Sequence, residues 1–214
     1  MSHNGSVTER QADVRRGLRL EYTTLGYNVV EAVVSIVSGV LAGSVALIGF
    51  GVDAVIESIS GSIMLWRLKA DEHHRREEFE KRALKLIGWS FLLLAAYVGY
   101  EAAEKLWTRE EPRRSIAGIV IASCSVVIMP VLARKKRAVG HSIGSAAMVA
   151  DSRQTELCSW LSAILLSGLL LNAAAGWWWA DPVAGLAMVP IIAREGLAGL
   201  RGESCGCGGG HCQG

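Results

Sequence analysis

Several features that are common in secreted and soluble proteins are scarce or absent in this 214-residue sequence. The first twenty residues are polar and charged, and no short apolar run with a cleavage site follows them, so we expect no signal peptide. The five cysteines are scattered and do not form the framework of a secreted disulfide protein. The net charge is only +2, which gives no indication of nucleic-acid binding.

The sequence also lacks the marks of an enzyme. It has no recognisable nucleotide-binding loop, nucleophile–base pair or soluble catalytic domain, and alternating strand patterns are absent. Apolar runs are abundant instead: 51% of the residues are hydrophobic and the mean hydropathy is +0.32. Because only helices and closed barrels satisfy the backbone in lipid, we predict an all-α polytopic membrane protein that is not an enzyme.

Six apolar segments are each long enough to cross a bilayer. They cover residues 22–43, 45–68, 83–107, 116–133, 143–171 and 177–197. We expect a polar arm over 1–20, a six-helix domain over 21–200 and a polar tail over 201–214. A tight turn is predicted at Gly43 and Ser44, and charged linkers at 69–82 and 134–137.

The distribution of Lys and Arg predicts the orientation. Seventeen of these residues flank the segments on one side and four on the other. Both termini are therefore expected in the cytoplasm, with the chain in the plasma or inner membrane. Trp177, Trp178 and Trp179 would then lie at the outer interface as belt residues, with a ligand cage as the alternative.

Asp53 and Glu57 lie four residues apart within the second apolar segment, so they share one face of a helix. An ionised side chain at bilayer depth costs at least about 2.5 kcal/mol, and two on one face repel each other. A cation path explains the pair directly. The alternative is that both acids only fix packing through hydrogen bonds to neighbouring helices.

The fifth segment carries a polar stripe of Asp151, Gln154 and Cys158. The second and fifth helices run antiparallel, and the rise of about 1.5 Å per residue places both polar stripes near the same depth. Carboxylates, an amide oxygen and a thiolate around one cation suit Zn²⁺ or a softer divalent ion such as Cd²⁺ or Co²⁺. The alternative is that Cys158 packs against lipid or a neighbouring helix as a small apolar group.

Further polar residues lie inside the apolar segments. Asn28 and Glu31 share a face of the first helix, and Glu31 is either a further metal ligand or a buried hydrogen-bonded acid. Arg153 lies three residues before Glu156 and can pair with it. Such a pair is either a structural latch or a charge that moves toward the site when the cation leaves.

The end of the sequence gathers soft metal ligands. Three thiols and an imidazole lie within eight residues: Cys205, Cys207, His211 and Cys212. Such a group suits a soft, tetrahedral cation, although a disordered Gly-rich tail with incidental cysteines is the alternative. His73 and His74 are expected in a solvated charged loop.

These residues give the sequence its resemblance to a known family. The features are Gly-Ser-Val-Ala-Leu at 43–47, Asp53 with an acid four residues later, Ala150-Asp151 and Asp181-Pro182. Over roughly 20–200 the sequence resembles the cation diffusion facilitator family. That resemblance implies export of divalent metals, mostly zinc, usually by proton exchange and usually as a homodimer.

The resemblance also implies a central site of two acids from the second helix and a His and an Asp from the fifth. Asp53 and Glu57 match the two acids, whereas Gln154 stands where the family has His and Cys158 where it has Asp. After Leu200 only the Cys-rich tail follows, so the sequence looks like a small divergent branch without the family's cytoplasmic domain, similar also to the synaptic-vesicle zinc transporter type.

Two functions remain open at this point. The first is a secondary transporter that exports a Zn-like cation in exchange for protons, with the lipid bilayer, the metal and a second copy as partners. The second is a membrane metal sensor or accessory protein that binds a soft metal through its tail without transport. Flux in proteoliposomes separates them.

Overall fold

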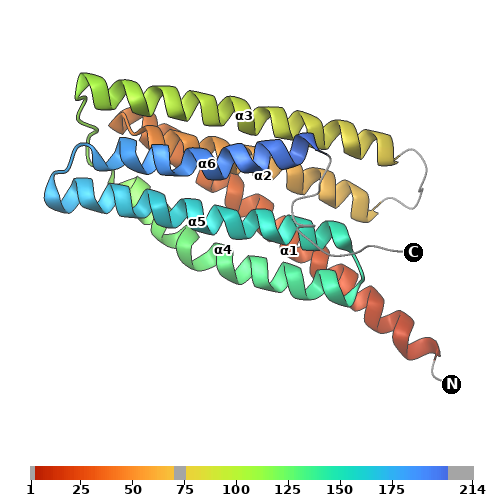
Figure 1. Cartoon of the computed structure of the whole chain (residues 1–214). Helices are drawn as coiled ribbons and strands as arrows, with labels where there is room; N and C mark the ends of the chain where they lie inside the picture. The colour runs from red at the N-terminus through yellow and green to blue at the C-terminus, as the bar shows by residue number, and fades with distance from the viewer. Residues whose placement is uncertain (1–2, 70–75, 202–214) are drawn as a thin grey trace.

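The computed structural model describes residues 3–69 and 76–201, which form six helices and, within these ranges, no strand. The helices are α1 (His3–Ala42), α2 (Val45–Lys69), α3 (Arg76–Thr108), α4 (Ile116–Ser142), α5 (Ala146–Ala175) and α6 (Ala180–Leu200). They run alternately up and down in one bundle (Figure 1). The predicted tail ligands Cys205, Cys207, His211 and Cys212 and the loop residues His73 and His74 lie outside the described residues.

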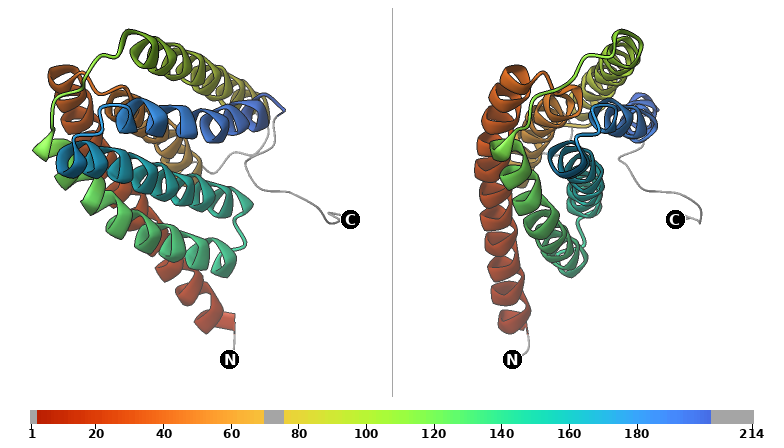
Figure 2. Two further views of the ribbon diagram at one scale, coloured as in Figure 1. Left: turned by 60° about the vertical axis from the view of Figure 1, so that its left-hand side comes forward. Right: turned by 90° about the vertical axis from the view of Figure 1, so that its left-hand side faces the viewer.

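Helix α2 is the centre of the bundle, because it contacts α1, α3, α5 and α6. Helix α1 packs on α2 and α4 at one side, and α3 pairs with α6 at the other (Figure 2). Helix α5 lies on α4 and also contacts α2 and α6. The first turns of α1 extend beyond the ends of the neighbouring helices.

Gly-Ser pairs mark two of the connections. Gly43 and Gly144 each have φ of +67°, a conformation that favours glycine, and each follows the end of a helix. The next residue is a serine whose hydroxyl accepts a hydrogen bond from the new helix: Ser44 from Leu47 N at 3.1 Å, and Ser145 from Met148 N at 3.3 Å. These pairs turn the chain within a few residues, so consecutive helices lie side by side.

The start of α2 is fixed by a residue from α6. The Ser44 hydroxyl donates to Asp181 Oδ1 at 2.5 Å, and Val45 N donates to Asp181 Oδ2 at 3.1 Å. Both carboxylate oxygens therefore have a donor, and the negative charge lies at a helix N-terminus, where it is stabilising. This contact explains two of the motifs in the sequence, the Ser44 turn and Asp181-Pro182, as parts of one structural joint.

Small residues bring α1 against α2. A Cβ atom on Gly51 would lie 2.9 Å from Ile36 N, and one on Gly39 would lie 2.9 Å from Ile48 N. Small residues at such positions let two helix backbones approach closely. The two helices approach closely on the segment of α2 that leads to Asp53.

Helix α1 has a polar side and an apolar side, arranged inside out relative to a soluble protein. Its buried stripe contains five polar residues at spacings of three and four: Glu21, Thr24, Asn28, Glu31 and Ser35. Its exposed side carries valines such as Val29, Val33 and Val37. Lipid on one side and polar protein on the other explain this pattern.

Five helices are long and apolar enough to cross a membrane, counted over the described residues only. The spans are Ala12–Ala42, Val45–Ile63, Ile116–Ser142, Asp151–Ala175 and Ala180–Leu200. Helix α3 is not among them, and its place in the bilayer rests on its apolar sequence and its packing along α6. The all-α polytopic fold predicted from the sequence is confirmed.

One sequence-based boundary needs correction. The predicted linker at 134–137 is wrong, because these four basic residues lie inside α4, which runs on to Ser142. The described part of the 1–20 arm is a helical extension of α1 throughout. In α4 the helix continues through the basic residues because one side of it is packed against α1 and α5.

The basic residues gather at the end of the bundle where α1, α3 and α5 begin and α2, α4 and α6 end. We call this end the basic end; it carries Arg15, Arg16, Arg19, Lys85, Arg134, Lys135, Arg137, Arg194 and Arg201. The opposite end carries Lys105, Arg109, Arg113 and Arg114.

Candidate cation site

The acids predicted from the sequence meet in the middle of the bundle. Across α2 and α5, the Thr155 hydroxyl donates to Glu57 Oε1 at 2.9 Å, and the Ser60 hydroxyl donates to Gln154 Oε1 at 3.0 Å. Because these helices are antiparallel, moving from Thr155 to Cys158 on α5 corresponds to moving from Glu57 to Ala54 on α2. Cys158 is therefore level with the stretch between Asp53 and Glu57.

Glu31 reaches the same level from α1. Its side chain is fully buried, and its Oε2 accepts from Cys158 Sγ at 3.9 Å. Its Oε1 accepts from the Ser125 hydroxyl of α4, and Ser125 also lies 2.6 Å from the Tyr27 hydroxyl. The acid that sequence reasoning left between a ligand and a structural role thus touches the thiol of the fifth helix.

Asp53 and Glu57 are buried, with 6% and 3% of their surfaces exposed. Asp53 interacts electrostatically with Glu57 and Glu31. Glu57 Oε2 is buried, and among the described residues no hydrogen-bond donor reaches it. We call Asp53, Glu57, Glu31 and Cys158 the central cluster. Its three carboxylates repel one another at bilayer depth, so the cluster favours a bound cation or protons.

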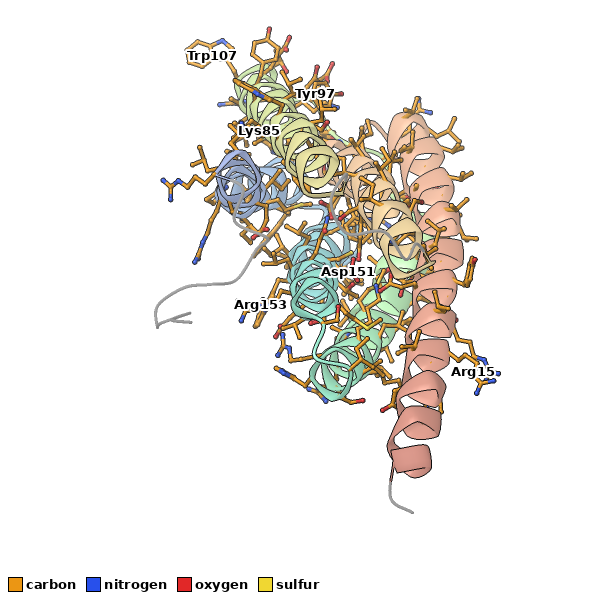
Figure 3. The ribbon with its side chains drawn as sticks, turned by 90° about the vertical axis from the view of Figure 1, so that its right-hand side faces the viewer. Arg15, Lys85, Tyr97, Trp107, Asp151 and Arg153 are labelled. Carbon is orange, nitrogen blue, oxygen red and sulfur yellow. The ribbon has the colours of Figure 1, made fainter. Side chains whose placement is uncertain are left out.

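The polar stripe predicted on the fifth helix divides in the structure. Cys158 faces Glu31, whereas Gln154 is half buried, accepts from Ser60 and leaves its Nε2 without a partner. Asp151 does not face the central cluster directly; its Oδ2 accepts from Lys136 Nζ at 2.6 Å. In Figure 3 Asp151 points toward the middle of the bundle, while Arg153 lies on the outer side of α5.

Glu156 has its partner on another helix. It forms an ion pair with Arg137 of α4, with both side chains partly exposed. Sequence spacing suggested Arg153 as its partner, three residues earlier on the same helix. The pairing with Arg137 joins α4 to α5 near the basic end, outside the central cluster.

Sequence reasoning missed two buried charges. Lys136 was counted with the basic residues outside the membrane, but it is 1% exposed and donates to Glu21 Oε2 at 3.1 Å as well as to Asp151. Glu21 is also 1% exposed. Helical spacing could have indicated that Lys136 is buried, because this residue lies on the same stripe of α4 as the buried residues Met129, Leu132 and Gly140.

The central cluster supplies oxygen and sulfur donors from three helices. Carboxylates and a thiol form the borderline-soft set that suits Zn²⁺ and its softer relatives. Among the described residues, no three His, Cys, Asp or Glu side chains converge closely enough to hold a metal ion in this conformation. Side-chain rotation within the cluster is therefore part of any binding event.

The comparisons with known proteins show the family of the chain. Residues 23–201 match the family described as the Cation efflux transmembrane domain. The chain belongs to the cation efflux family. The matched range begins within α1 and runs to the end of α6, so the resemblance inferred from the sequence is confirmed, and the central cluster lies inside a cation transporter domain.

Three curated relatives are similar to the chain. It is 26% identical over 156 residues to the uncharacterized transporter sll1263 of Synechocystis sp.. It is 25% identical over 174 residues to the uncharacterized transporter MJ0449 of Methanocaldococcus jannaschii. These matches cover 68% and 78% of the chain but only 49% and 61% of the relatives. A match to Transmembrane protein 163 of Xenopus laevis is 24% identical over 192 residues, 88% of the chain and 68% of that relative.

Proposed function

We propose that this protein exports a divalent transition-metal cation, Zn²⁺ first, in exchange for protons, and that the central cluster binds the cation. The observation that carries the proposal is the meeting of Asp53, Glu57, Glu31 and Cys158 at one level of a membrane bundle. A bound cation offsets the cost of burying three carboxylates at that depth, and the thiol favours softer ions.

Gln154 completes the proposed ligand set. Its Oε1 already faces α2, where it accepts from Ser60, three residues after Glu57, so an amide oxygen is available as a ligand beside the Glu57 carboxylate. An amide does not take up protons, so the protons that displace the cation bind to the carboxylates and the thiol. This chain therefore differs from the family pattern at the residue that would be His.

The direction follows from charge. The basic end faces the cytoplasm under the positive-inside rule, so the cation enters the site from that end and leaves at the opposite end. The proposal includes the plasma or inner membrane as the location and a homodimer as the working form. Crosslinking in native membranes tests the dimer.

Flux in proteoliposomes tests the proposal. Purified protein is reconstituted, a Zn²⁺ gradient is imposed, and metal uptake and internal pH are followed together. Wild-type protein should move Zn²⁺ with opposite proton flow, while Glu31→Gln should lose most of the flux. Glu104→Gln, an exposed acid of α3, is the matched control. Zn²⁺ flux that is equal in wild type and Glu31→Gln would remove Glu31 from the ligand set, and absence of any flux would reject transport.

A further inference from the structure

The charge network beside the central cluster joins three helices. Lys136 of α4 donates to Glu21 Oε2 of α1 at 3.1 Å and to Asp151 Oδ2 of α5 at 2.6 Å. We call these residues the Lys136 network. All three side chains are buried, so the ammonium has exchanged its hydration shell for two carboxylates. This single side chain therefore bonds to carboxylates of two neighbouring helices, α1 and α5.

The Lys136 network lies between the central cluster and the basic end. Asp151 precedes Thr155 by one helical turn on α5, and Thr155 is the residue that donates to Glu57. Glu21 Oε2 lies next to Gly61 of α2, at 3.7 Å from the position of a Cβ atom there, and Gly61 follows Glu57 by one turn. On both helices the displacement is about 6 Å toward the basic end.

The four helices α1, α2, α4 and α5 therefore contribute to the surroundings of both the central cluster and the network. Glu21 comes from α1 and is flanked by Gly61 of α2, while Lys136 and Asp151 come from α4 and α5. A cation that approaches the central cluster from the basic end must pass this level. In this conformation the level is filled by an ammonium group, which repels a divalent cation.

Thr155 connects the two sites. Its hydroxyl donates to Glu57 Oε1 at 2.9 Å, and its oxygen lies 3.5 Å from Lys136 Nζ, within hydrogen-bond distance. A hydroxyl has one proton, so a change in the position of Lys136 alters the acceptor strength and orientation of this group. The carboxylate in the central cluster and the ammonium in the network are thus linked through one side chain.

We propose that the Lys136 network is the gate between the cation site and the basic end of the bundle, closed in this structure and opened when Lys136 leaves Glu21 and Asp151. The gate rests on the proposed transport function for its purpose. Its structural effect, the closure of one side of the bundle, is measurable without any metal. Lys136 acts here as a positioning residue that holds α1, α4 and α5 together.

Cys158 is a natural reporter for this gate, because it lies in the central cluster and is 1% exposed. The other four cysteines, Cys124, Cys205, Cys207 and Cys212, are replaced by serine, so that Cys158 is the sole thiol. The protein is reconstituted into liposomes, and a membrane-impermeant methanethiosulfonate is added to one side at a time. A separate Lys135→Cys variant of a Cys-free background identifies the side that the basic end faces.

Removal of one charge from the network would leave its partners buried and unpaired, which lowers stability. The test variant therefore neutralises all three residues. It combines Glu21→Gln, Lys136→Met and Asp151→Asn, which keep the side-chain sizes similar. We expect Cys158 labelling from the basic end to become at least about tenfold faster, within the range of ordinary coupling free energies. Labelling from the opposite end should stay unchanged. In the control variant Lys135→Met, changed at an exposed neighbouring position, Cys158 should label at the same rate as in the protein with the network intact.

The gate would be overturned if the folded triple variant labelled from the basic end no faster than the protein with Cys158 as its sole thiol and the network intact. It would also be overturned if the labelling rate rose equally from both ends, because that result indicates a general loosening of the bundle. Monodispersity in size-exclusion chromatography establishes folding. Added Zn²⁺ separates the two proposals. If Zn²⁺ fails to protect Cys158 from labelling, the cation site is wrong, while the labelling rates without metal still decide the gate.

Discussion

Asp181 and Glu57 are both buried acids inside the bundle, but their surroundings differ. Both oxygens of Asp181 accept hydrogen bonds, from the Ser44 hydroxyl and from Val45 N, and its charge lies at the N-terminus of α2. Glu57 Oε1 accepts from Thr155, while no donor among the described residues reaches its Oε2, and two further acids lie nearby. A carboxylate with satisfied oxygens stabilises a helix joint, whereas one left short of donors beside like charges is suited to a cation that comes and goes.

The largest loss of metal flux is expected when an acid of α2 is neutralised, which tests the contrast between Glu57 and Asp181. Asp53→Asn or Glu57→Gln should abolish metal flux, because each removes a charged ligand, with little loss of folded protein. Each change also removes a charge whose burial is costly, so the melting temperature is expected to stay the same or rise. Proteoliposome flux and thermal melts in detergent measure both quantities. Full flux in either variant would show that the pair only fixes packing.

A loss of stability without a loss of flux is expected when the joint between Asp181 and the start of α2 is broken. Asp181→Ala should lower the free energy of unfolding by about 1–3 kcal/mol, because the Ser44 hydroxyl and Val45 N lose their acceptor. Flux per folded molecule should remain near the wild-type value. Folded yield and melting temperature measure the first effect, and flux normalised to monodisperse protein measures the second. A variant that is stable but inactive would place Asp181 in the transport path.

A smaller change is expected when the donor type in the central cluster is altered. Cys158→Asp replaces a soft thiolate by a harder carboxylate, so the ratio of Cd²⁺ to Zn²⁺ flux should fall several-fold while Zn²⁺ flux is kept. Cys158→Ser should lose the preference for Cd²⁺ without improving Zn²⁺ flux. Equal flux ratios in wild type and both variants would mean that Cys158 is only a packing residue beside Glu31.

The smallest effect is expected at the end of the sequence. Deletion of residues 204–214 removes Cys205, Cys207, His211 and Cys212, which are predicted to capture metal before it enters the bundle. Uptake at low metal concentration should weaken, and maximal flux should stay near that of the full chain, because the central cluster is intact. Complete loss of flux at saturating metal would give the tail a role in transport itself.

Much of the fold was predictable from the sequence because apolar runs and their length determine where helices cross a membrane. The six segments correspond to the six helices, and the Gly43-Ser44 turn lies where predicted. The end of the fourth helix was predicted too early, at residue 133, because a run of four basic residues resembles a linker when its burial is unknown. Only the packing of α4 against α1 and α5 shows that one of the four is inside.

For the candidate site, spacing identified residues on one helix but not the partners across helices. Asp53 and Glu57 share a face because the helix repeats every 3.6 residues, and that argument needs no structure. Asp151 and Gln154 seemed to belong to the same site as Cys158 on equal grounds. In the structure Asp151 contacts Lys136 of α4 and Gln154 contacts Ser60 of α2, because residues along one stripe of α5 lie against different helices.

The sequence by itself determined the helices, the polar residues inside them and the unequal charge at the two ends, since each depends on local periodicity or composition. The tertiary structure decided which buried charges meet. Lys136 pairs with Glu21 and Asp151 only because α4 is packed against α1 and α5 at one depth and rotation, and a buried charge takes its partner from whichever helix is brought within reach.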